Sequence, residues 1–163
     1  MRSAIAIGIF GLAIISNGAA AQTALEQNAI LRDFQLRVAD YTLQHDGLTM
    51  FPWAVSAATP APKIFTLPVA MVFRQIIARA IARGEGGAAI SGTATRHHPA
   101  VLQPFPSSEL ADFPRVLSDA LPLLPAPLEY RLIGNDLVIR DTSGDVIVAV
   151  LAEALGGIVT RQR

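Results

Sequence analysis

The residues most able to carry chemistry are three histidines, His45, His97 and His98. His97 and His98 are adjacent in a stretch that we predict to be a loop. Two neighbouring imidazoles can turn toward one ion in a loop, whereas in a helix or a strand they point in different directions. The sequence shows no second ligand pair at zinc-like spacing. His97 and His98 are therefore candidate metal ligands, with solvent-exposed loop histidines as the alternative, and we predict no resident metal or cofactor.

A second polar cluster is the run Asp141-Thr142-Ser143-Gly144-Asp145. An aspartic protease loop would lack the extra serine and would follow an uninterrupted apolar strand, and an EF-hand would need twelve residues ending in glutamate. A turn between two strands accounts for Asp, Ser and Gly without a ligand. We interpret this run as a turn.

Other catalytic signatures are missing from the chain. There is no Gly-x-Ser-x-Gly, and the glycines around Gly86 lack the preceding strand and the following Lys-Ser/Thr of a phosphate-binding loop. Cysteine is absent, which excludes disulfides, thiolate zinc sites and cysteine nucleophiles. We predict that the protein is not an enzyme.

Composition narrows the class further. The chain has 163 residues, of which 52% are hydrophobic and 16% charged, with thirteen basic and thirteen acidic residues. Such an apolar chain is not intrinsically disordered, and a net charge of zero argues against a nucleic-acid-binding protein. Its length suits one domain of ordinary size.

The first residues have the layout of a secretory signal peptide. Arg2 precedes an apolar run, 4–15, which small residues and then polar Gln22 follow. The run is shorter than the roughly 20 apolar residues that cross a bilayer. We predict a signal peptide over 1–21 with cleavage between Ala21 and Gln22, a periplasmic or secreted location, and a mature domain over 22–163.

Two helices are expected in the mature domain. The first covers about 23–45, with a buried face through Phe34 and Val38. Leu25, Leu36 and Leu43 form a separate stripe on this helix. Such a stripe either packs beneath the following loop, which is the interpretation we favour, or contacts another subunit. The proline-containing segment 46–65 is predicted to be that loop.

The second helix is expected between Thr66 and Gly84, with a core face centred on Phe73. Arg74, Arg79 and Arg83 lie on its other side. They either form the solvated face of an ordinary core helix or bind a membrane surface or an anionic partner. Segment 84–106 reads as irregular, and a short helix is expected within 107–120, broken or restarted at Pro114.

The C-terminal third predicts a β-meander. Strands 128–133 and 136–140 alternate around Gly134-Asn135, a dipeptide suited to a tight hairpin turn. Leu128, Tyr130 and Leu132 are expected on one face of the sheet. A third strand is expected over 146–151, although the run to Leu155 also fits a helix. Residues 22–120 are thus mainly helical with long loops, and 128–151 form the meander.

The run from Leu121-Pro122-Leu123-Leu124-Pro125 through Leu128-Glu129-Tyr130-Arg131 and Ile133-Gly134-Asn135-Asp136-Leu137-Val138 to Ile147-Val148 resembles a known module. It is similar to the C-terminal hairpin of small exported bacterial proteins, many of them uncharacterised. A related hairpin occurs in the periplasmic nickel/cobalt homeostasis (RcnB-like) proteins. The resemblance covers the last quarter to third of the chain and implies an exported hairpin protein, with no catalytic residue to carry over.

The sequence therefore predicts an α+β fold in which two main amphipathic helices pack on a C-terminal three-stranded antiparallel β-meander. The expected function is that of an exported, non-enzymatic protein acting through contacts with an unknown protein partner or as a homo-oligomer. The alternatives are a periplasmic metal-homeostasis or envelope-stress accessory factor and a peripheral membrane-surface binding protein. No nucleic-acid partner is expected.

Overall fold

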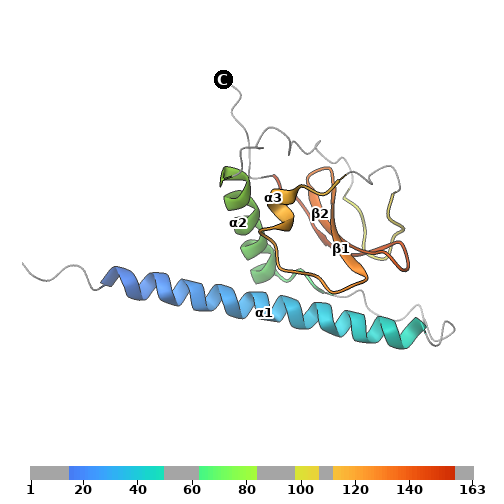
Figure 1. The fold of residues 1–163 in the computed structure, drawn as a ribbon, viewed down its shortest axis with the longest axis horizontal. Coiled ribbons are helices and arrows are strands. Elements are labelled where there is room, and N and C mark those ends of the chain that lie inside the picture. The colour runs from blue at the N-terminus through green and yellow to red at the C-terminus, as the bar shows by residue number, and fades with distance from the viewer. Residues whose placement is uncertain (1–14, 50–62, 84–97, 107–111, 157–163) are drawn as a thin grey trace, which may run out of the picture.

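The computed structural model describes the backbone of residues 15–49, 63–83, 98–106 and 112–156, and the side chains of 21–44 within the first range. A long helix, α1 (Ile15–Thr49), runs beneath the rest of the described chain. Helix α2 (Leu67–Arg83) stands on it, beside a short helix, α3 (Arg115–Ser118), and a small sheet (Figure 1). Helices followed by a C-terminal sheet confirm the predicted α+β class.

Helix α1 is longer than the sequence pattern indicates at both ends. It begins at Ile15, inside the predicted signal peptide, and continues to Thr49, four residues into the predicted loop. The first proline of that loop is Pro52, so none of the residues 46–49 lacks the backbone N–H that a helix uses. Helix α2 agrees with expectation, because it follows Thr66 and ends at the residue before Gly84.

The sheet is a meander in the order β1-β2-β3, built from β1 (Leu128–Ile133), β2 (Asp136–Asp141) and β3 (Val146–Leu151). Ile133 pairs with Asp136 across the two-residue turn, and Gly134 has the positive φ of 58° that the turn requires. The pairing of β2 with β3 shifts register between Ile139 and Arg140. The predicted hairpin and third strand are both confirmed, and 152–156 form turns rather than a helix.

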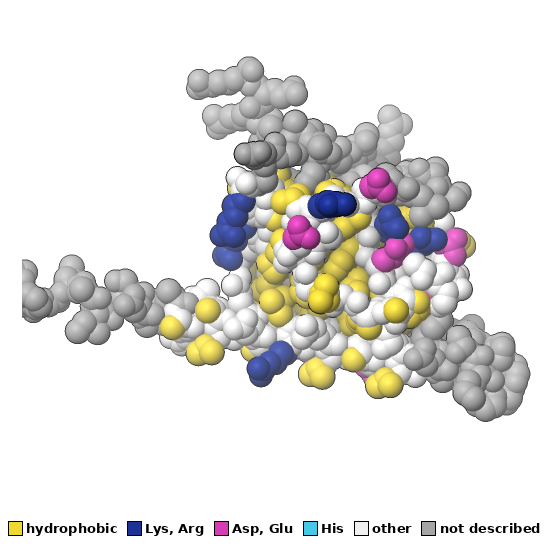
Figure 2. Space-filling view, viewed as in Figure 1, with side chains coloured by type: hydrophobic (Ala, Val, Ile, Leu, Met, Phe, Trp, Pro, Cys, Tyr) yellow, Lys and Arg dark blue, Asp and Glu magenta, His cyan; other side chains and the backbone are white. Residues whose placement is uncertain are grey.

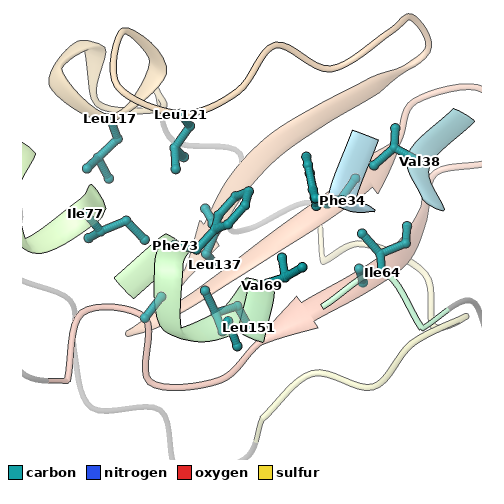
Figure 3. Close-up of a cluster of buried hydrophobic side chains, with 14 of the residues drawn as sticks. Phe34, Val38, Ile64, Val69, Phe73, Ile77, Leu117, Leu121, Leu137 and Leu151 are labelled. Carbon is teal, nitrogen blue, oxygen red and sulfur yellow. The ribbon is translucent and has the colours of Figure 1, made fainter. Parts of the chain in front are cut away.

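The main core lies between the helices and one face of the sheet. Phe34 of α1 packs against Phe73 of α2, with ring centroids 4.7 Å apart, and Phe65 lies against both rings. Side chains from every layer point into this cluster (Figure 3). Its fully buried members include Phe34, Ile64, Val69, Phe73, Ile77, Leu117, Leu137, Ile139 and Leu151.

A smaller core covers the opposite face of the sheet. Phe105 packs there on Val138 and Ile147. The chain before it adds to the edge of β3, since the backbone N–H of Leu102 donates to the Ile147 carbonyl and the N–H of Phe105 to the Asp145 carbonyl. Segment 98–106, predicted to be irregular, is thereby fixed along the sheet edge. Strand β2 is consequently buried on both faces.

Candidate functional site

Three groups able to ligate a cation meet at one end of the sheet. They are the imidazole of His98, the carboxylate of Asp136 and the carboxylate of Glu153, and one ligand atom from each lies within 4.8 Å of the others. His98 precedes the segment that pairs with β3, Asp136 is the first residue of β2, and Glu153 follows β3. The cluster therefore joins three separate parts of the chain.

The meander explains why the two carboxylates are neighbours. The Gly134 turn places Asp136 at the start of β2, and the pairing of Leu137 with Leu151 brings the end of β3 alongside it. Glu153 lies two residues beyond Leu151, in a turn where its own φ is 51°. His98 is brought to the same end because segment 98–106 runs along β3.

Asp136 is the fixed centre of the cluster. Its side chain is fully buried, and each carboxylate oxygen has a partner: Oδ1 accepts the backbone N–H of Glu153 at 2.8 Å, and Oδ2 lies 2.7 Å from His98 Nδ1. The hydrogen bond with Asp136, followed by attraction to that carboxylate, raises the pKa of His98 above its ordinary 6.5. Glu153 and half of the His98 imidazole face solvent.

Of the residues predicted from sequence, His98 alone belongs to this cluster. His97, with which we paired it, and the side chain of His45 lie outside the described residues. Asp136 and Glu153 were missed. The predicted meander held the signal that could have found them, because an antiparallel partner strand ending at residue 151 must place 152–153 beside residue 136.

The Asp141 run is a turn, as expected. The Asp141 carboxylate accepts the backbone N–H of Ser143 at 2.9 Å, and its other oxygen accepts the phenol O–H of Tyr41 at 2.9 Å. Burial, followed by the Asp141 contact, raises the pKa of Tyr41, so the phenol remains the donor. This carboxylate is fully buried and attaches α1 to the sheet.

Charged groups on the face of the sheet that Phe105 covers pair with one another. Glu129 accepts from Arg131 and from Arg140, each at 2.8 Å, and Arg140 also contacts Asp145. The hydrogen bond from Arg131, followed by that from Arg140, lowers the pKa of Glu129. These groups form an internally neutralised network.

The predicted arginine face of α2 is not a single surface. Arg74 is partly buried and donates to the Ala152 carbonyl at 2.8 Å, beside the turn that holds Glu153. Arg79 and Arg83 are exposed. Arg74 is thus engaged by the chain that follows β3, whereas the role of the arginine face stays a prediction.

Three leucines of α1 lie outside the described core. Leu25, Leu36 and Leu43 are 70%, 70% and 74% exposed, so no described segment covers them. Residues 50–62 of the loop that we predicted to cover them lie outside the described residues, so that hypothesis stays a prediction. The face of α1 that carries these leucines points away from Phe34 and the core. Figure 2 shows hydrophobic side chains at intervals along this free edge of α1, with a basic side chain among them.

The predicted cleavage point between Ala21 and Gln22 lies within α1, among side chains that are exposed from Ala21 to Glu26. Among the described residues, no helix has the length and apolarity needed to cross a membrane. Comparison with protein-family models, with curated proteins and with solved structures finds no match to this chain.

Proposed function

We propose that the chain is an exported, non-enzymatic protein that acts through protein–protein contacts, and that it pairs with a second copy of itself through α1. The contact surface is the outer face of α1, defined as Leu25, Ala29, Arg32, Leu36, Ala39 and Leu43. The observation that carries the proposal is the exposure of its three leucines, each at least 70%. Large apolar side chains on one side of a helix are typical of an interaction site.

The spacing of these residues favours another helix as the partner. Successive members of the outer face are four, three, four, three and four residues apart. This alternation is the 3.5-residue repeat of a coiled-coil seam, in which the same edge of the helix faces its partner at every turn. The alanines at 29 and 39 let two backbones approach closely between the leucine layers.

The order of residue types favours an antiparallel pair of identical helices. The outer face reads Leu, Ala, Arg, Leu, Ala, Leu, and its positions are symmetric about residue 34. In an antiparallel pair Leu25 meets Leu43 of the second copy, and Ala29 meets Ala39 of the second copy. Two-fold symmetry requires such self-complementarity, since each contact must occur twice.

Charge supports the same orientation. A parallel pair would place the two Arg32 guanidinium groups in one layer, where they repel. The antiparallel pair instead sets Arg32 against Leu36 of the second copy, one turn from the exposed Asp40 on that helix. Arg32 can then pair with a carboxylate at the edge of the seam.

The rest of the described chain leaves room for this partner. Helix α2 and the sheet lie on one side of α1 (Figure 1). The residues of the outer face are exposed and lie opposite the buried Phe34 on the helix. Two copies can therefore join through α1 with their cores on opposite outer sides. The seam is shorter than the three to four heptads of a persistent coiled coil, so we expect weak, concentration-dependent pairing.

Analytical ultracentrifugation of the chain from Gln22 onward tests the pairing. We expect dimer to accumulate as concentration rises to several hundred micromolar, and Leu36→Glu to weaken association at least tenfold by placing a charge in the seam. Leu123→Glu is the matched control, because Leu123 is 87% exposed and lies outside the outer face. A chain that stays monomeric throughout, or equal effects of the two substitutions, would contradict the proposal.

Cysteine cross-linking tests the orientation, and the chain has no cysteine of its own to interfere. Residues 25 and 43 are about 27 Å apart along the helix, too far for a bond within one chain. We expect the double variant Leu25→Cys/Leu43→Cys to form a covalent dimer under oxidation, and Leu25→Cys alone to form little. Efficient cross-linking of the single variant would show a parallel pair instead.

A further inference from the structure

We infer that His98, Asp136 and Glu153 form a binding site for a divalent transition-metal cation, for which Zn²⁺ is the probe. The inference is independent of the proposed pairing, because the three residues lie at the end of the sheet and the outer face lies on α1. It rests on the convergence of three potential ligands, one imidazole and two carboxylates, from separate parts of the chain.

The donor set decides the class of cation. One imidazole nitrogen and two carboxylates carry up to two negative charges, which suits a divalent ion. Ca²⁺ and Mg²⁺ prefer all-oxygen sites, whereas Zn²⁺ and its first-row neighbours bind imidazole well. A site with three protein ligands also leaves the fourth tetrahedral position for water or another ligand.

The distances require only a small adjustment. Bonds of about 2.1 Å from a tetrahedral zinc ion place neighbouring ligand atoms about 3.4 Å apart. The three atoms already lie within 4.8 Å of one another, and His98 Nδ1 is 2.7 Å from Asp136 Oδ2. The side chains that would move, His98 and Glu153, are the exposed ones, and the buried Asp136 remains in place.

Surrounding contacts prepare the site. The N–H of Glu153 holds the second oxygen of Asp136 and so orients the carboxylate, as outer-shell hydrogen bonds do for metal ligands. Arg74 is attached to the carbonyl of Ala152, which fixes the turn that presents Glu153. A bound cation would join the segment at His98 to both strand ends.

Isothermal titration calorimetry of the full mature chain with Zn²⁺, after treatment with a chelator, tests the inference. We expect one ion per chain, a loss of affinity of at least tenfold in His98→Ala and in Glu153→Gln, and much weaker binding of Ca²⁺. Glu153→Gln replaces an exposed side chain and should leave the fold intact. His98→Ala removes one partner of the buried Asp136, so circular dichroism checks that this variant is folded before its affinity is compared. His45→Ala and Glu26→Gln leave the three ligands unchanged and should bind as the wild type does.

Two results would overturn the inference. One is the absence of any Zn²⁺ heat up to millimolar concentration, which would leave His98 and Asp136 as a hydrogen-bonded pair only. The other is binding that His45→Ala abolishes and Glu153→Gln does not. Ultracentrifugation in excess chelator separates the two proposals, since pairing through α1 should persist without metal.

Discussion

Single polar residues in this protein hold distant parts of the chain together. Asp136 and Asp141, at the two ends of β2, are both fully buried, and each accepts hydrogen bonds from elements far away in sequence. Asp136 is hydrogen-bonded to His98, and Asp141 accepts the phenol O–H of Tyr41 of α1. A buried carboxylate is stable only with such partners. The aspartates therefore fix the positions of segment 98–106 and of α1 on the sheet.

The pair of His98 and Asp136 predicts a pH dependence of stability in metal-free protein. Because the pKa of His98 is raised on folding, the folded chain binds this proton more tightly than the unfolded chain does. The stabilisation that the His98–Asp136 pair gives the folded chain is complete below the unfolded pKa of His98, about 6.5. It is lost as pH rises through the higher pKa of His98 in the folded chain. The exposure of the imidazole keeps the effect small.

Urea unfolding of wild type and His98→Gln, both in chelator, measures this effect. The stability of the wild type relative to the variant should be largest near pH 5.5 and should decline toward pH 8, in proportion to the protonated fraction. A difference that grows with pH would show that the imidazole binds as a neutral group.

At the scale of elements, the local parts of the fold were predictable and the long-range contacts were not. The Gly134-Asn135 hairpin and strand 146–151 follow from alternation and turn chemistry within a few residues. The pairing of Arg74 with the Ala152 carbonyl depends on how α2 packs, which no local pattern encodes. The same reason explains why His98 could not be linked to Asp136 from the sequence, although the meander alone places Glu153 beside Asp136.

The hairpin turn yields a prediction at this scale. Gly134→Ala places a Cβ at φ 58° and should lower the free energy of unfolding by about 1–2 kcal/mol. Gly144→Ala, in the second turn, is the control. Its φ is outside that region and its Cβ would meet Val146 Cγ2 at an ordinary 3.5 Å, so a change below about 1 kcal/mol is expected. Urea denaturation measures the free energy of unfolding of both variants. Equal losses would show that the positive φ at Gly134 is not the cause of the destabilisation.

At the scale of the whole molecule, residues 21–26 of α1 lie outside the described core. Ala21 to Glu26 are exposed, and Gln27 bonds to Gln75 of α2 at 3.2 Å. We therefore expect the chain from Gln22 onward to unfold within about 3 °C of the full chain in a thermal melt, as for changes at exposed positions. A drop of about 10 °C would show that residues 1–21 support the fold.

The bond between Tyr41 and Asp141 spans 100 positions of the chain. During synthesis from the N-terminus, α1 is made long before the strands against which Phe34 and Val38 pack. Until those strands are made, α1 exposes two apolar sides. One side carries Phe34 and Val38 and later packs on the sheet, and the other is the outer face. The order of the elements therefore delays completion of the fold until the C-terminal strands have been made. A chaperone that binds nascent chains would bind α1.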